Sequence, residues 1–195
     1  MINSTAVILA GGKSSRMGQN KALLTLKGKT LIEIMLEKVS DFDEIFISSN
    51  EPDLYAFTGV AVIEDQDMGF GPLQGILSCL TASKHECISI MPCDAPLIPK
   101  GLSEYILEQA QRYDIAVATF NGKNEPLIAT YNKSIIPTLT ELHNNSIGKV
   151  GAALSKCNTN YIELRDLVQF GNPEEYLINT NDPKTFEQMS ALYFR

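Results

Sequence analysis

Short apolar runs alternate with longer segments of helical spacing along most of the chain. The first run, TAVILA at residues 5–10, is followed by two glycines, as expected for a central strand that is covered on both faces. Similar runs predict strands at residues 44–48, 60–63, 87–91 and 115–120. Between them, apolar residues at helical spacing predict amphipathic helices around residues 31–39, 73–80 and 102–110. The alternation predicts an α/β fold with helices on both faces of a wound, mostly parallel sheet.

The regularity changes after residue 120. Asn121-Gly122-Lys123-Asn124 joins two apolar runs and predicts a β-hairpin, which would make this side of the sheet mixed. Beyond it we expect a short helix at residues 147–154 and a strand at residues 159–164. A final helix is expected at residues 182–189, capped by Asp182 with Pro183 at its first position. Because no repeat, linker or low-complexity segment interrupts the pattern, we expect one domain over residues 1–195.

The composition is that of an ordinary acidic globular protein. The 195 residues include 16 Lys and Arg against 23 Asp and Glu, a formal net charge of −7. An acidic protein repels polyanions, which argues against unspecific binding to nucleic acid or to an anionic membrane. The four cysteines form no C-x-x-C pair, so we expect buried free thiols rather than a zinc site or disulfides. The sequence has neither a signal-peptide pattern nor a membrane-span pattern, which predicts a cytoplasmic protein.

Positive charge gathers directly after the first strand. Lys13, Arg16 and Lys21 lie there among three glycines, and the first 32 residues contain no acidic side chain. Glycines let backbone N–H groups approach a phosphate chain, and the cations neutralise it, so this segment is a candidate phosphate site. It is not a P-loop, because the glycine required five residues before Gly12 is Val7, and it contains no G-x-G-x-x-G. Kinases, GTPases and dinucleotide-dependent dehydrogenases are therefore disfavoured.

A second candidate is the acid that follows the strand at residues 87–91. Asp94 lies between Pro92 and Pro96, at the carboxyl end of a strand, where ligands bind in open α/β sheets. A divalent cation on a nucleotide takes one or two carboxylates plus phosphate oxygens. Asp94 is therefore a candidate metal ligand, and a turn acid or a helix cap before Pro99 is the alternative. Its neighbour Cys93 is interpreted as a small buried residue, because nothing in the sequence activates it.

A third candidate segment, residues 63–76, runs from a strand through an acidic loop with three glycines into a helix. Glycines near a helix start permit a close approach of a ligand. Asp65 is the acid whose position favours a role in binding, whereas Glu64 and Asp67 are interpreted as acids of a flexible loop.

The three motifs together resemble a known family. Residues 9–24, Gly71-Pro72-Leu73-Gln74-Gly75-Ile76 and Pro92-Cys93-Asp94-Ala95-Pro96 resemble the molybdenum cofactor guanylyltransferases, MobA-like members of the nucleotidyltransferases. Asn179-Thr180-Asn181-Asp182-Pro183 is similar to the late Asn-x-Asn-x-Pro element of that family. The resemblance implies a Rossmann-like three-layer fold of the nucleotide-diphospho-sugar transferase type. It also implies transfer of GMP from GTP to the terminal phosphate of molybdenum-molybdopterin, with release of pyrophosphate and formation of molybdopterin guanine dinucleotide.

The resemblance also implies roles for individual residues. Arg16, Lys21 and Asp94 would be catalytic, with Asp94 as the ligand of a Mg²⁺ cofactor, and Asn179 and Asn181 would lie on the pterin side. The implied nucleotide contacts are Leu9, Ala10, Gly11, Gly12, Lys13, Lys21, Asn50, Asp65, Gly71, Gly75 and Asp94. The implied partners are GTP and molybdenum-molybdopterin as substrates, with molybdenum-insertion and molybdoenzyme maturation proteins beside them. Two positions depart from the family: Asn20 stands where an acid is usual, and Asp182 where Thr is usual.

The reaction implied by the resemblance needs no strong general base, because the attacking phosphate is already anionic at neutral pH. His85 and His143 are accordingly expected to be surface residues. The alternatives are a cytidylyltransferase acting on the same pterin, another small nucleotidyltransferase, and a catalytically silent nucleotide-binding protein. The presence of both Lys21 and Asp94 argues against the silent protein.

Overall fold

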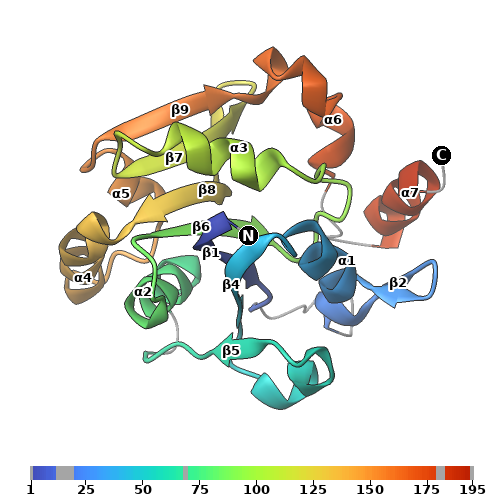
Figure 1. The fold of residues 1–195 in the computed structure, drawn as a ribbon, viewed down its shortest axis with the longest axis horizontal. Helices are drawn as coiled ribbons and strands as arrows, with labels where there is room; N and C mark the ends of the chain where they lie inside the picture. The colour runs from blue at the N-terminus through green and yellow to red at the C-terminus, as the bar shows by residue number, and fades with distance from the viewer. Residues whose placement is uncertain (1, 12–19, 68–69, 179–182, 194–195) are drawn as a thin grey trace.

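The computed structural model describes residues 2–11, 20–67, 70–178 and 183–193. Within these ranges seven strands form one sheet in the order β5-β4-β1-β6-β8-β7-β9 (Figure 1). Neighbouring strands are parallel from β5 to β6, β8 is antiparallel to both of its neighbours, and β9 is parallel to β7. The strands are β1 (Ile2–Leu9), β4 (Phe42–Ser48), β5 (Ala61–Ile63), β6 (Cys87–Pro92), β7 (Ile115–Phe120), β8 (Lys123–Asn132) and β9 (Thr159–Glu163).

The helices form two layers around this sheet. The α-helices are α1 (Leu31–Lys38), α2 (Pro72–Ala82), α3 (Leu102–Gln109), α4 (Ile136–Asn144), α5 (Gly151–Leu154), α6 (Pro173–Tyr176) and α7 (Pro183–Tyr193). Short 3₁₀ helices are η1 (Lys21–Leu23), η2 (Pro52–Thr58), η3 (Lys133–Ile135), η4 (Leu164–Asp166) and η5 (Val168–Phe170). A two-stranded ribbon of β2 (Thr25–Leu26) and β3 (Lys29–Thr30) packs with α1 and α7.

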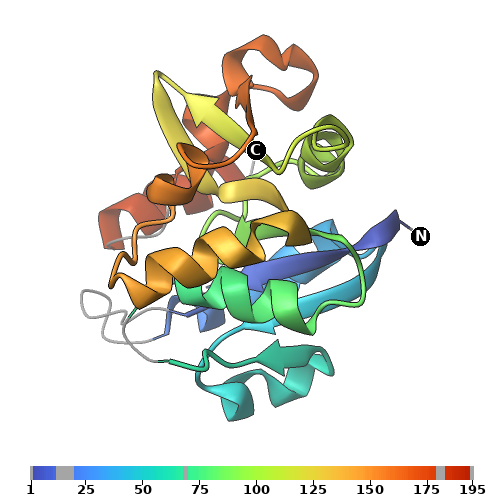
Figure 2. The same cartoon turned by 90° about the vertical axis from the view of Figure 1, so that its left-hand side faces the viewer.

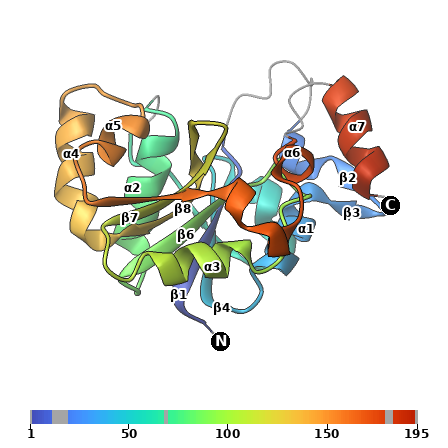
Figure 3. The same cartoon turned by 90° about the horizontal axis from the view of Figure 1, so that it is seen from above.

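Each face of the sheet has its own core. Alternate side chains of β1 point to opposite faces: Ala6 and Ile8 belong to the cluster with α1 and α3, and Val7 to the cluster with α2, α4 and α5. All three are fully buried, which explains the continuous apolar run of this central strand. Figures 2 and 3 show the same layers: α2 and α4 lie side by side on one face, and α3 lies on the other.

Most of the predicted elements are present. The five strands predicted first and the three helices between them are confirmed with boundaries shifted by a few residues. The predicted hairpin joins β7 and β8, and Asn121 and Gly122 both have positive φ, 53° and 71°, as a type I′ turn requires. The strand at residues 159–164 is confirmed as β9. The described part of the last helix is α7, Pro183–Tyr193, which extends beyond residue 189, and Asp182 lies outside the described residues.

Several elements differ from the prediction. The helix expected at residues 147–154 is wrong over its first half, because α5 begins only at Gly151. Gly148 lies so close to Phe70 that a Cβ on it would be 2.9 Å from the Phe70 carbonyl oxygen, and residues 147–149 have no regular secondary structure. Helix α4 and the ribbon of β2 and β3 were not predicted. None of the helices in the described ranges has the length and apolar character needed to cross a membrane.

Candidate active site

The carboxyl ends of β1, β4, β5 and β6 lie in register at one edge of the sheet. Leu9 pairs with Ser48 of β4 and with Pro92 of β6, and Ser48 pairs with Ile63 of β5. Backbone hydrogen bonds continue past the strands: Ala10 N–H donates to the Ser48 carbonyl at 3.0 Å. The segments that leave this edge carry the candidate residues found in the sequence, so the parallel register is what gathers them.

Lys21 and Asp94 meet at this edge. The Nζ atom of Lys21 lies 3.4 Å from Oδ2 of Asp94, and the two side chains are only 20% and 17% exposed. Asp94 follows β6, and the Cys93 N–H beside it donates to the Leu9 carbonyl at 3.1 Å. Lys21 begins η1, whose Ala22 N–H is capped by the Asn20 side chain at 3.0 Å. The pair therefore joins two segments that are separated by 73 residues.

Asn50 and Asp65 form a second pair, at the ends of β4 and β5. Asn50 Nδ2 donates to Asp65 Oδ2 at 3.1 Å, and the Asp65 N–H donates to Asn50 Oδ1 at 2.7 Å. Burial raises the pKa of the Asp65 carboxyl above its usual value, and the Asn50 amide opposes that shift. The Asp65 carboxylate is thus held in place by Asn50 and is partly desolvated.

The glycines of the third motif have a structural cause. A Cβ on Gly75 would lie 2.7 Å from Ser48 Oγ and 3.5 Å from Asp65 Oδ1, so α2 packs closely on the strand ends only because this residue has no side chain. Gly71, the residue before α2, has φ of 61°, a conformation that L-residues with a side chain rarely adopt. Gly75 therefore lets the first turns of α2 lie beside Asp65, and Gly71 permits the turn that enters the helix.

We expect Asp65→Asn to raise the thermal stability of the ligand-free protein at pH 7 and to weaken GTP binding about tenfold or more. A carboxyl whose pKa is raised by folding favours the folded state at low pH, and this contribution is lost as the pH rises through the folded-state pKa. The neutral amide removes the loss, so the stability difference should shrink as the pH falls and vanish below the pKa of this carboxyl in the unfolded chain. Melting curves from pH 4 to pH 8 and calorimetric titration with GTP measure both effects.

The control for that variant is Asp53→Asn, at an exposed position of η2. It should leave GTP affinity unchanged. A variant at Asp65 that melts earlier at pH 7 and binds GTP as well as the wild type would contradict this assignment of Asp65.

The structure gathers most of the predicted site residues. Around one edge it places Leu9, Ala10, Gly11, Lys21, Asn50, Asp65, Gly71, Gly75 and Asp94. Gly12, Lys13 and Arg16 lie outside the described residues, as do Asn179 and Asn181. Among the described residues no group of three or more His, Cys, Asp or Glu side chains could hold a metal ion, and Asp94 remains the one proposed ligand.

One residue of this edge was missed by the sequence analysis. Tyr55 of η2 is fully buried, and its hydroxyl lies 3.2 Å from the Ala10 carbonyl oxygen and 3.1 Å from Asn20 Nδ2. Tyr55 lies 45 positions from Ala10 in the sequence, in a stretch without glycine-rich or charged motifs, so no local pattern indicated it.

The remaining nucleophiles and bases do not belong to the site chemistry. Burial raises the pKa of both Cys79 and Cys93 to about 12, so these thiols stay protonated at neutral pH, and all four cysteines are free. The interpretation of Cys93 as a small buried residue is confirmed by its 8% exposure. His143 is half-buried, with its ring 4.1 Å from that of Phe70 and Nε2 3.5 Å from an Asp67 oxygen.

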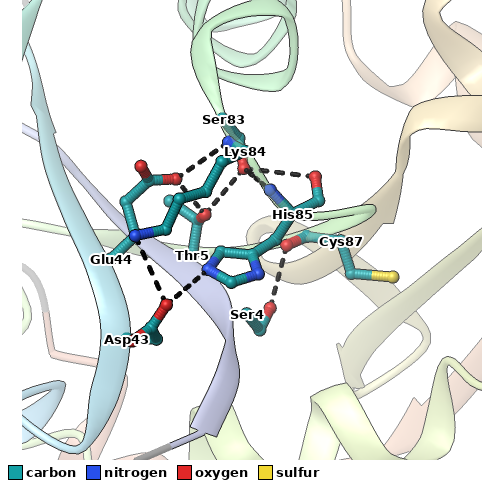
Figure 4. Close-up of polar contacts among 8 residues, drawn as sticks. All are labelled: Ser4, Thr5, Asp43, Glu44, Ser83, Lys84, His85 and Cys87. Carbon is teal, nitrogen blue, oxygen red and sulfur yellow. Dashed lines mark hydrogen bonds and ion pairs between the residues drawn. The ribbon is translucent and has the colours of Figure 1, made fainter.

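His85 lies at the opposite, amino edge of the sheet. Figure 4 shows His85 and Lys84 pointing to the same Asp43 carboxylate, with Nε2 and Nζ at 3.0 and 3.4 Å from Oδ2. Beside them Thr5 donates to Glu44 at 2.7 Å. Both histidines are therefore partly buried beside a carboxylate rather than freely exposed, and the contacts of His85 join β4 to the loop before β6.

Comparison with known proteins identifies the family to which the chain belongs. The sequence profile of the MobA-like NTP transferase domain matches residues 6–157. The chain is 36% identical over 196 residues to a protein named probable molybdenum cofactor guanylyltransferase from Carboxydothermus hydrogenoformans, with 99% of this chain and 98% of that protein covered. A protein of the same name from Bacillus cereus is 35% identical over 189 residues, which cover 93% of each chain.

A solved structure supports the fold. The crystal structure of molybdopterin-guanine dinucleotide biosynthesis protein A from Archaeoglobus fulgidus matches with a TM-score of 0.84 at 23% identity, covering 97% of this chain and 98% of that one. The predicted Rossmann-like fold and the resemblance carried by the three motifs are both confirmed. The protein belongs to the MobA-like NTP transferase family.

Proposed function

We propose that this protein transfers GMP from GTP to the terminal phosphate of molybdenum-molybdopterin, releasing pyrophosphate and forming molybdopterin guanine dinucleotide. The observation that carries the proposal is the Lys21–Asp94 pair, 3.4 Å apart at the carboxyl edge of the sheet. A cation for phosphate and a carboxylate for a nucleotide-bound metal lie together there, in a chain whose relatives are named probable molybdenum cofactor guanylyltransferases.

The Asn50–Asp65 pair supports guanine as the base. Guanine presents N1–H and N2–H₂ as adjacent donors, which match a carboxylate that is partly desolvated and held in place by its neighbour. Cytosine has no such pair of adjacent donors, so it satisfies this carboxylate less well. A buried acceptor that gains donors on binding favours the ligand that supplies them.

The chain's own residues supply positioning and charge. In the reaction, an oxygen of the terminal pterin phosphate forms a bond to the α-phosphorus of GTP, and the bond from that phosphorus to the bridging oxygen of the β-phosphate breaks. The pyrophosphate keeps the electron pair of the broken bond. Because an anion attacks a polyanion, the main requirement is neutralisation and alignment, and Lys21 supplies a cation beside the strand ends.

Asp94 fits the role of a magnesium ligand. Mg²⁺ takes one or two carboxylates together with phosphate oxygens, and the Asp94 carboxylate is partly exposed at the edge where a nucleotide would lie. When bound, the ion would neutralise charge that develops on the phosphates. Lys13 and Arg16 are proposed as further phosphate clamps, and Asn179 and Asn181 as contacts on the pterin side.

We infer a cytoplasmic location, which the four free cysteines support, because disulfides are rare in reducing compartments. Proteins that insert molybdenum or mature molybdoenzymes are the proposed partners on either side of the reaction.

The test is thermal stability in the presence of Mg²⁺ and, separately, GTP, CTP, ATP and UTP. A nucleotide at a hundred times its dissociation constant stabilises the folded state by about 2.7 kcal/mol. We expect GTP to give the largest rise in melting temperature. A rise with CTP alone would replace the proposal with a cytidylyltransferase, and no rise with any nucleotide would contradict a site that is ready to bind in the free protein.

A further inference from the structure

The Tyr55 hydroxyl is a buried polar group outside the motifs of the site. Its ring comes from η2, between β4 and β5, and is fully buried under the end of β1. The hydroxyl donates to the Ala10 carbonyl at 3.2 Å. Asn20 Oδ1 is a second acceptor, at 3.5 Å, but this oxygen already accepts the Ala22 N–H at 3.0 Å, so the shorter contact to Ala10 takes the single proton.

The Asn20 amide joins this hydroxyl to the lysine segment. Asn20 Nδ2 donates to the Tyr55 hydroxyl at 3.1 Å and lies 3.4 Å from Glu51 Oε2. Asn20 Oδ1 caps η1, which begins at Lys21. The donor and acceptor ends of this amide therefore have different partners, and these partners define which way the amide points.

The Tyr55 side chain thus contacts both Ala10 and Asn20, the residues on either side of the phosphate motif. Ala10 and Asn20 flank residues 11–19 in the sequence, and Lys21 follows Asn20 directly. We infer that Tyr55 is a positioning residue, whose hydroxyl links the end of β1 to the Asn20 cap and so sets Lys21 beside Asp94 for the triphosphate. This inference rests on the proposed function, in which Lys21 binds the phosphates of GTP.

The same contacts explain why position 20 carries an amide. A carboxylate at this position would still cap η1, but it would face Glu51 across 3.4 Å and would offer no donor to the Tyr55 hydroxyl. Like charges at that distance repel, so an acid at position 20 is disfavoured beside Glu51. The amide of Asn20 avoids this repulsion and supplies the donor to Tyr55.

The main experiment compares Tyr55→Phe with Tyr131→Phe. Tyr131 is the matched control, because it is also fully buried and its hydroxyl donates to a backbone carbonyl, that of Pro126, at 2.6 Å. Dissociation constants are measured for Mg²⁺–GTP and for guanosine, which has the base and sugar but no phosphate. We expect Tyr55→Phe to raise the dissociation constant of Mg²⁺–GTP about tenfold and that of guanosine less than about twofold. The reason is that one hydrogen bond is lost on the phosphate side.

A purely structural role would not produce this selectivity. Equal losses for GTP and guanosine, or equal effects of the two Tyr→Phe variants on GTP, would overturn the inference. Failure of the wild type to bind GTP would instead contradict the proposed function. Amide hydrogen exchange of the ligand-free protein tests the positioning of η1 independently of GTP binding. Tyr55→Phe should speed exchange of the Ala22 and Leu24 N–H groups, whereas Tyr131→Phe should not. Unchanged exchange in Tyr55→Phe would overturn the inference whatever GTP does.

A second pair of variants tests the match between Asn20 and Glu51. Asn20→Asp should weaken GTP by about as much as Tyr55→Phe, because it removes the donor and adds a like charge. The double variant with Glu51→Gln removes the like charge and should recover the part of the lost GTP affinity that the repulsion causes, but not the part that comes from the lost donor to Tyr55. Losses that simply add in the double variant would show that the two side chains act independently, against the inference.

Discussion

We expect Asp94→Ala to lower the rate of GMP transfer by about a thousandfold or more while the protein stays folded. A bound metal supplies several kcal/mol of charge stabilisation in phosphoryl chemistry, and each tenfold in rate corresponds to about 1.4 kcal/mol. The Asp94 side chain is partly exposed and lies in a turn after β6, so its removal opens no cavity in either core. The loss should therefore appear in the rate and not in the circular dichroism spectrum.

The measurement is the initial rate of pyrophosphate release from GTP with Mg²⁺ and molybdenum-molybdopterin. Asp67→Ala is the matched control, an exposed acid of the loop before α2 that contacts His143, and it should keep the wild-type rate. Wild-type turnover by Asp94→Ala would remove Asp94 from the mechanism.

The second large effect is expected for Lys21→Met, which should lower kcat/KM for GTP about a hundredfold. Removing one preorganised charge or donor from a developing phosphate charge typically costs a factor of 10² to 10³. Methionine keeps much of the length of the lysine side chain but not its charge, so the packing of η1 changes little. Asp94 remains in Lys21→Met, so the residual rate should still depend on Mg²⁺.

The control for charge alone is Lys29→Met, another cation of the N-terminal segment, half-exposed and paired with Glu37. It should change kcat/KM for GTP less than about twofold, because exposed ion pairs contribute little. Equal losses in the two lysine variants would indicate a general effect of net charge, and an unaffected Lys21→Met would exclude Lys21 from phosphate binding.

Patterns that depend on neighbouring residues predicted the fold well. The apolar run before Gly11 marks a strand buried on both faces, and Asn121-Gly122 marks the turn between β7 and β8. Helix α4 was not predicted, although Pro137 lies in its first turn and Leu139 and Leu142 are buried, and it packs on α2. The helix expected from residue 147 begins only at Gly151, and the preceding Gly148 packs closely against Phe70, a tertiary contact that the local pattern does not reveal.

In the site, too, residues in local sequence patterns were predicted and residues that depend on tertiary contacts were not. Asp94, Asp65 and Lys21 were found because they follow strands or glycines in a recognisable order, and the parallel register brings their segments together. Tyr55 was not found, because its role depends on contacts with Ala10 and Asn20 that only the folded chain creates. The glycine at position 75 was interpreted through ligand approach, and the structure adds a packing reason, its closeness to Ser48.

The most direct test of the central proposal follows the α-phosphate. The purified protein is given Mg²⁺, molybdenum-molybdopterin and GTP labelled at the α-phosphate, with labelled CTP in a parallel reaction. We expect label from GTP in a pterin dinucleotide, one pyrophosphate released for each product formed, and little transfer from CTP. Preferred transfer from CTP, or binding of GTP with no label reaching the pterin, would contradict the proposal.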